Sequence, residues 1–371
     1  MKIEPFRVEI WMNEWETKCD LNLAETCVES LTIAELLDLT GQNATDLSAL
    51  LPLKMTYGAI DGSMRLREAI SALYDKQAPD NVIVTHGTIG ANMLIHRSLV
   101  DRRDRVVSVV PTYQQHYSIP ESIGADVHLL HLREENGWLP DLDLLRQLVV
   151  PGTKMIALTN PNNPTGTMMS REALSNLMAA ADSAGIRFIS DEIYHGLDYA
   201  FPAVTAAELS PNALVINSFS KYFCMTGWRV GWMVVPEVLV RPIERLQQNL
   251  SISVPTLSQI AAEAAFEGRA EMEAIKRGYQ ENRRILIEGL PKAGLTKFLP
   301  ADGAFYLYAD VSDFTSDSFA FASEMLEKAH VAATPGVDFD PIHGRAFIRF
   351  SYARSAAEMQ EAVARIAHWL K

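Results

Sequence analysis

Residues 153–166 read TKMIALTNPNNPTG, a short apolar run that stops at two Asn-Pro pairs. A short apolar run bounded by turn residues is typical of a buried strand, and Asn-Pro pairs mark turns. The stretch therefore predicts a buried strand with a polar loop at its carboxyl end.

The same pattern repeats on both sides of this stretch, from residue 60 to about 235. Alternating strands and helices indicate an α/β fold, a mostly parallel sheet with helices on both faces. Ligands of such sheets bind beyond the carboxyl ends of the strands, so we expect the site in those loops. Seven strands are predicted at 81–85, 105–110, 126–132, 153–159, 187–190, 213–217 and 231–236, and helices at 63–74, 90–100, 118–124, 141–148 and 170–185.

The pattern changes after residue 238. A long helical region with a break at Pro255 is followed by two predicted strands, at 304–309 and 346–351, and by a last helix at 356–370. We expect two domains. The large one spans 46–275 and carries the sheet, and the small α+β one combines 1–45 with 276–371.

Composition excludes several classes of protein. The 371 residues include 46 acidic and 33 basic side chains, a net charge of −13, which argues against nucleic acid and anionic membranes as partners. Three cysteines are too few for a disulfide framework. The first residues lack the apolar core of a signal peptide, and no apolar run is long enough to span a membrane. We expect a cytoplasmic protein.

The loop after the strand at 213–217 carries a candidate catalytic lysine. Lys221 follows two serines, and Arg229 comes eight residues later. A lysine that is desolvated and close to other cations loses its proton near neutral pH and then forms Schiff bases with carbonyls. Hydroxyls and an arginine beside it suit a phosphate. These residues together predict a site for a phosphorylated aldehyde.

Other strand-end loops complete this chemistry. Gly87 and Thr88 stand between a strand and a helix, where backbone N–H groups bind anions. Asp191 follows another strand and supplies the anion that keeps a pyridine nitrogen protonated. Each feature alone has a plainer explanation, such as a solvated lysine or a helix cap. Four loops in order fit one cofactor, pyridoxal phosphate.

The chain resembles the class I/II aminotransferases, the fold type I enzymes that use pyridoxal 5′-phosphate, from about residue 57 to its end. The resemblance implies transfer of an amino group between an L-amino acid and a 2-keto acid. The motifs that carry it are NPNNPTG at 160–166, DEIY at 191–194, SFSK at 218–221, GWRVG at 227–231 and Arg349.

The resemblance also implies roles for residues around the cofactor ring. Lys221 matches the lysine that forms the Schiff base and moves the substrate proton. Asp191 matches the partner of the pyridine nitrogen. Tyr194 and Asn163 match the donors to the phenolate oxygen of the ring, and Tyr113 matches the aromatic residue stacked on it.

Further roles concern the phosphate, the substrate and a second subunit. Tyr57 resembles a tyrosine that reaches the phosphate from the neighbouring subunit, which implies a homodimer with shared active sites. Arg349 matches the arginine that binds the substrate α-carboxylate, with Asn163 beside it. The residues similar to the phosphate cradle are Gly87, Thr88, Ile89, Ser218, Ser220 and Arg229.

The N-terminal segment departs from the family pattern. Residues 22–27 read NLAETC, without the usual glycine and with an acidic Glu25. One hypothesis is that Glu25, or Glu14 before it, pairs with a basic substrate side chain such as that of arginine. No arginine stands out for a second substrate carboxylate, so strict aspartate specificity is not expected.

The motifs leave the reaction partly open. Transamination competes with other chemistry of the same carbanion, namely C–S β-elimination, racemisation and an arginine-type oxidase or cyclase reaction. A non-enzymatic regulator is disfavoured by the charge of −13. No metal site is expected, because His128 and His131 would face opposite sides of a strand.

Overall fold

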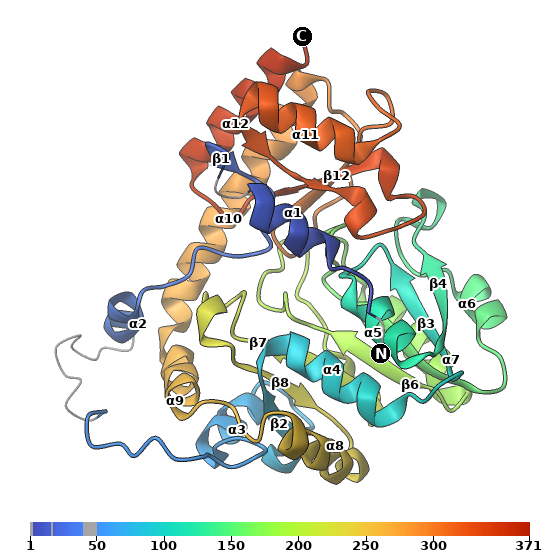
Figure 1. The fold of residues 1–371 in the computed structure, drawn as a ribbon, viewed down its shortest axis with the longest axis vertical. Helices are drawn as coiled ribbons and strands as arrows, with labels where there is room; N and C mark the ends of the chain where they lie inside the picture. The colour runs from blue at the N-terminus through green and yellow to red at the C-terminus, as the bar shows by residue number, and fades with distance from the viewer. Residues whose placement is uncertain (1–2, 16–17, 40–49) are drawn as a thin grey trace.

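A seven-stranded sheet forms the centre of the computed structural model, which describes residues 3–15, 18–39 and 50–371 (Figure 1). Its strand order is β2-β8-β7-β6-β5-β3-β4. Each of the seven predicted strands is present, and the predicted α/β class is confirmed. The strands are β2 (Val82–Thr85), β3 (Arg105–Val110), β4 (Asp126–His131), β5 (Thr153–Thr159), β6 (Arg187–Asp191), β7 (Ala213–Ser218) and β8 (Gly231–Val234).

Helices cover both faces of this sheet, because alternate side chains of each strand point to opposite faces. Ile83 packs in one apolar cluster with Ala91 of α4 and Ile243 of α8. Its neighbour Val84 belongs to the other cluster, together with Leu174 of α7. The helices around the sheet are α3 (Met64–Ser71), α4 (Gly87–Leu99), α5 (Gln115–Ile123), α6 (Leu142–Leu148), α7 (Arg171–Ser183), α8 (Glu237–Leu250) and α9 (Thr256–Ala265).

A second, smaller sheet lies above the first in Figure 1 and is built from the C-terminal part of the chain. Its order is β11-β12-β9, all antiparallel, and a separate two-stranded pair joins β1 to β10. The remaining elements are α1 (Arg7–Trp15), β1 (Leu21–Asn22), α2 (Ile33–Leu39), α10 (Arg269–Gly289), β9 (Tyr306–Asp310), α11 (Ser318–Ala329), β10 (Val331–Ala332), β11 (Thr334–Pro335), β12 (Phe347–Ser351) and α12 (Ala356–Trp369).

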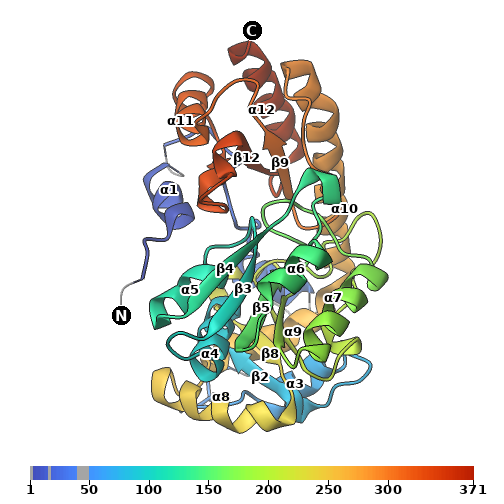
Figure 2. The same ribbon diagram turned by 90° about the vertical axis from the view of Figure 1, so that its right-hand side faces the viewer.

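The helix α10 runs alongside both sheets, and Figures 1 and 2 show it as one continuous rod. The predicted domain limit at 275 falls inside this 21-residue helix. The other predicted limit, at 45, lies outside the described residues. The division into domains therefore stays a prediction. No helix within the described ranges is long and apolar enough to span a bilayer.

The direction of β8 determines which loops meet. Six strands of the large sheet run parallel, and β8 runs antiparallel to both of its neighbours. Its first residue, Gly231, pairs with Thr85 and Ser218, the last residues of β2 and β7. The loop before β8, with Arg229, therefore lies at the same edge as the loop with Lys221.

Candidate active site

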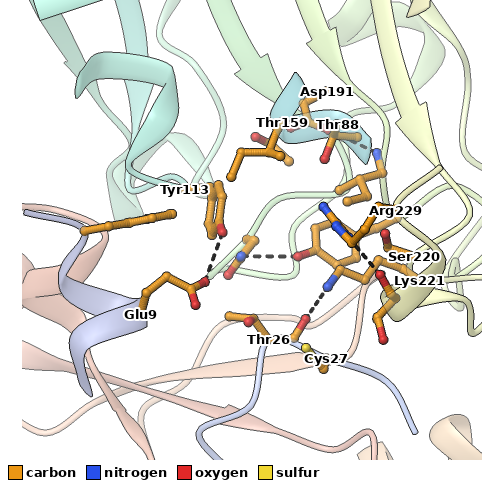
Figure 3. A pocket seen from close by; sticks show the side chains of 16 residues that line it. Glu9, Thr26, Cys27, Thr88, Tyr113, Thr159, Asp191, Ser220, Lys221 and Arg229 are labelled. Carbon is orange, nitrogen blue, oxygen red and sulfur yellow. Dashed lines mark hydrogen bonds between the residues drawn. The ribbon is translucent and has the colours of Figure 1, made fainter. Parts of the chain in front are cut away.

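A cavity of about 450 Å³ opens at this edge, and Figure 3 shows its lining. It lies between the large sheet and the N-terminal segment. Nine residues predicted from the sequence line it: Thr88, Ile89, Tyr113, Asn163, Asp191, Tyr194, Ser220, Lys221 and Arg229.

Lys221 lies three residues after the end of β7, is buried and lines this cavity. Its amine donates a hydrogen bond to the backbone carbonyl of Thr26. Burial lowers the pKa of the Lys221 amine, and the cations of Arg349 and Arg229 lower it further. Since burial disfavours the charged form, these surroundings shift the amine toward the neutral form that acts as a nucleophile or a base.

Asp191 is the last residue of β6, and its carboxylate is held from two sides. One oxygen lies 3.1 Å from Nε2 of the buried His116, and the other accepts the backbone N–H of Ile193 at 3.2 Å. The Asp191 side chain is 5% exposed. A buried carboxylate thus reaches the cavity in a fixed orientation.

Asn163 and Tyr194 both line the cavity and are hydrogen-bonded to each other. The Asn163 amide donates to the Tyr194 hydroxyl at 3.2 Å, and that hydroxyl lies 3.1 Å from the hydroxyl of Tyr306. Burial raises the pKa of Tyr194 well above its ordinary value. The phenol therefore stays protonated and is available as a donor.

The start of α4 places hydrogen-bond donors and a guanidinium side by side. Its N-cap residue, His86, makes no side-chain capping bond, and the first N–H groups of a helix have no partner within it. Gly87 has φ +67°, and a Cβ built there would lie 2.8 Å from Nη2 of Arg229. The Arg229 guanidinium thus lies against the helix start, with Thr88 and Ser220 on the same cavity. Helix start and guanidinium together suit a phosphate.

Arg349 on β12 is fully buried behind the cavity. Its guanidinium lies between the rings of Tyr306 and Phe339, at 4.2 and 4.7 Å from their centroids. Nη1 donates to Oδ1 of Asn163 at 2.9 Å, and Nη2 donates to the backbone carbonyl of Ala24 at 2.6 Å. Arg349 therefore reaches the cavity through Asn163 and does not itself line it.

Four other predicted site residues do not line the cavity. Gly87 flanks it under Arg229, whereas the Ser218 hydroxyl accepts the backbone N–H of Ser220. The Tyr57 side chain is 81% exposed. The Glu25 carboxylate pairs with Arg354 and accepts the amide of Asn22, so its predicted contact with substrate stays a prediction that this arrangement does not favour.

The sequence missed part of the lining. Thr159 and Thr226 stand next to recognised motifs, and this position in the sequence could have identified them as lining residues. Phe6 and Glu9 belong to the N-terminal segment, which no local pattern connects to a cavity more than a hundred residues away. The missed lining residues are Phe6, Glu9, Thr26, Cys27, Thr159, Ile193 and Thr226.

The fold and this site together define a class of α/β enzymes with a buried lysine and an anion cradle at one sheet edge. The family model described as "Aminotransferase class I and II" matches residues 48–366. The chain belongs to this family, and the protein is an aminotransferase, which transfers an amino group between an L-amino acid and a 2-keto acid.

Three relatives illustrate the family. A valine–pyruvate aminotransferase of Mycobacterium tuberculosis is 40% identical over 85% of this chain and 84% of its own. An aspartate aminotransferase of Pyrococcus horikoshii is 32% identical over 82% of this chain and 80% of its own. The crystal structure of a PLP-dependent aminotransferase from Streptococcus suis is 31% identical, with a TM-score of 0.93 over 100% of this chain and 98% of that one. The relatives share the reaction class and differ in the named substrate.

Proposed function

We propose that this aminotransferase uses pyridoxal phosphate bound covalently at Lys221. The observation that carries the proposal is the buried Lys221 amine beside a cavity that also holds the Asp191 carboxylate and the cradle around Arg229. The amine suits the aldehyde of the cofactor, the carboxylate suits its ring nitrogen, and the cradle suits its phosphate. The dependence of a close structural neighbour on PLP supports it.

The proposed roles follow from where the groups lie. Pyridoxal phosphate, when bound, supplies an aldehyde that condenses with amines and a ring that accepts electrons from the substrate Cα. The Lys221 amine binds the aldehyde carbon and, once released, carries the proton away from Cα. Asp191 keeps the ring nitrogen protonated, and Tyr194 and Asn163 donate to the ring oxygen.

The rest of the cavity binds the remaining charges. Arg229, Ser220 and the N–H groups at Thr88 and Ile89 bind the phosphate, and Tyr113 packs on the ring face. Arg349 binds the substrate carboxylate together with Asn163, its hydrogen-bond partner at 2.9 Å. The guanidinium groups of Arg229 and Arg349 then determine where the phosphate and the substrate carboxylate lie.

Chemical trapping tests the covalent link. The purified enzyme loaded with pyridoxal phosphate is reduced with borohydride, digested and measured by mass spectrometry. The cofactor mass is expected on the peptide that contains Lys221. Its recovery on another lysine, or on none, would contradict the proposal.

Replacement of Gly87 with alanine is expected to weaken cofactor binding about tenfold, because the new methyl group lies 2.8 Å from Arg229 Nη2 and displaces the guanidinium from the helix start. A hydrogen bond to a charged group contributes ~1.5–3 kcal/mol, and 1.4 kcal/mol is tenfold. Equilibrium titration with pyridoxal phosphate measures the dissociation constant. Gly185→Ala is the matched control, because Gly185 has φ +68° and open space around its Cβ position.

We also propose that the enzyme is a homodimer that uses an exposed apolar patch. Leu51 and Tyr57 are 82% and 81% exposed, and Met55 is 58% exposed. The Thr256 hydroxyl donates to the backbone carbonyl of Thr56, which links this segment to α9. Exposed large apolar side chains close together in one segment suit an interface, and Tyr57 would then face the partner subunit.

The double change Leu51→Asp and Tyr57→Asp is expected to convert the dimer into a monomer, because it buries two unpaired charges in the interface. Size-exclusion chromatography with light scattering measures the mass. Ile342→Asp, at an apolar residue 57% exposed in the small-sheet region, serves as the control and keeps the dimer mass. A wild-type monomer would contradict the proposal. The cytoplasmic location stays a prediction.

A further inference from the structure

The N-terminal helix α1 brings a carboxylate to the cavity. Glu9 lies in its first turn and lines the cavity, and Figure 3 shows it on the side opposite Arg229. Two hydrogen bonds of Arg7 hold the start of this helix in place. The backbone N–H of Arg7 donates to Oε1 of Gln114 at 3.2 Å, and the Arg7 guanidinium donates to the carbonyl of Val337 at 3.3 Å. The backbone that carries Glu9 is therefore held against the cavity.

Glu9 differs from the other charged groups of the lining. The proposed function uses Asp191, Lys221 and Arg229 for the cofactor and leaves Glu9 without a role. Its carboxylate accepts one hydrogen bond, from the Tyr113 hydroxyl at 3.3 Å. In the part of the chain that the structure describes, no cationic side chain forms an ion pair with it. A half-buried carboxylate without a cation favours a cationic ligand.

The surroundings of Glu9 suit a long side chain with a charged end. The ring of Phe6 packs edge-on against Tyr113, with 4.8 Å between the centroids, and both rings line the cavity. Aromatic walls cover the methylene groups of such side chains and attract cations. Glu25, by contrast, is already paired with Arg354.

We propose that Glu9 selects amino donors that carry an ammonium or guanidinium group on their side chain. This inference rests on the proposed function, in which the donor amine binds the cofactor aldehyde in place of Lys221 and Arg349 binds the donor carboxylate. The donor side chain then extends to the wall formed by Phe6, Glu9 and Tyr113. A carboxylate side chain at the same place meets a like charge, so Glu9 disfavours aspartate and glutamate.

A donor panel with the holoenzyme tests this. The kcat/KM of the first half-reaction is measured for lysine, for norleucine as its neutral analogue and for glutamate. In the wild type, lysine is expected to exceed norleucine by about tenfold or more, the effect of one charge-assisted hydrogen bond. Glu9→Gln keeps an acceptor for Tyr113 and removes the charge. This variant is expected to have a kcat/KM about tenfold lower for lysine, unchanged for norleucine and higher for glutamate.

Glu14→Gln is the matched control, because Glu14 is exposed on the same helix and lines a different cavity with Arg7 and Trp11. An equal loss for lysine in this variant would overturn the inference. An equal fall for all donors in Glu9→Gln would also overturn it, since Glu9 would then act only through Tyr113. Transfer from norleucine without any preference for lysine refutes the selectivity alone, whereas no transfer from any donor refutes the proposed function.

Discussion

Lys221→Ala is expected to lower kcat by about 10⁴-fold or more, because the variant lacks the group that carries the proton from Cα. The alanine also removes the amine that binds the cofactor aldehyde. Stopped-flow measurement of the first half-reaction gives the rate. Lys221→Arg keeps a cation and is expected to lose as much, since a guanidinium stays protonated and is a poor nucleophile.

Lys328→Ala is the control for this change. Lys328 pairs with Glu324 on the surface of α11, where its side chain is 61% exposed. Exposed pairs contribute ~1 kcal/mol or less, so its activity and melting temperature are expected to stay near those of the wild type. Turnover by Lys221→Ala at the wild-type rate would contradict the assignment of Lys221.

Asp191→Asn is expected to lower kcat by about 10²- to 10³-fold. The asparagine keeps the shape and removes the negative charge opposite the ring nitrogen, and the loss of one partner of a buried ion pair costs ~3–5 kcal/mol. The cofactor is expected to remain bound, because Lys221 and the Arg229 cradle are unchanged. The measurement is kcat together with the bound cofactor per subunit.

Glu192→Gln provides the comparison. Glu192 follows Asp191 and is fully buried, yet its carboxylate faces away from the cavity, toward the Ser190 hydroxyl and the backbone N–H of Ala206. Its kcat is expected to stay within a few-fold of the wild type. If both variants lost activity alike, the effect would belong to the fold of this turn, and Asp191 would have no separate role.

The sequence was sufficient for the large sheet because its strands are short apolar runs bounded by turn residues. It placed β5 at its observed limits and located the loops that carry Asn163, Asp191 and Lys221. It did not give the direction of β8, because a buried run has the same composition in either direction. That reversal is what brings Arg229 to the cavity.

The N-terminal part of the site was not predictable in the same way. The contact of Glu9 with Tyr113 joins residues 104 positions apart, and that of Glu25 with Arg354 joins residues 329 positions apart. No periodicity or local motif records such pairings. The sequence therefore suggested an acidic N-terminal residue, Glu25 or Glu14, as a specificity determinant, and it gave no signal for Glu9, which lines the cavity.

The protein itself already solvates the two Nη groups of the buried Arg349 guanidinium, whereas its Nε has no hydrogen-bond partner among the described residues. Its Nη2 group donates to the carbonyls of Ala24 and Glu25 and to the hydroxyl of Thr334. Under the proposed role of Arg349, the carboxylate of an arriving amino acid replaces these neutral acceptors and adds few new hydrogen bonds. The gain comes from replacing a dipole with a full negative charge, since charged acceptors bind about twice as strongly. Under that proposed role, the resting protein would select ligands with a carboxylate, because an amine, ester or amide offers Arg349 nothing better than its own main-chain carbonyls.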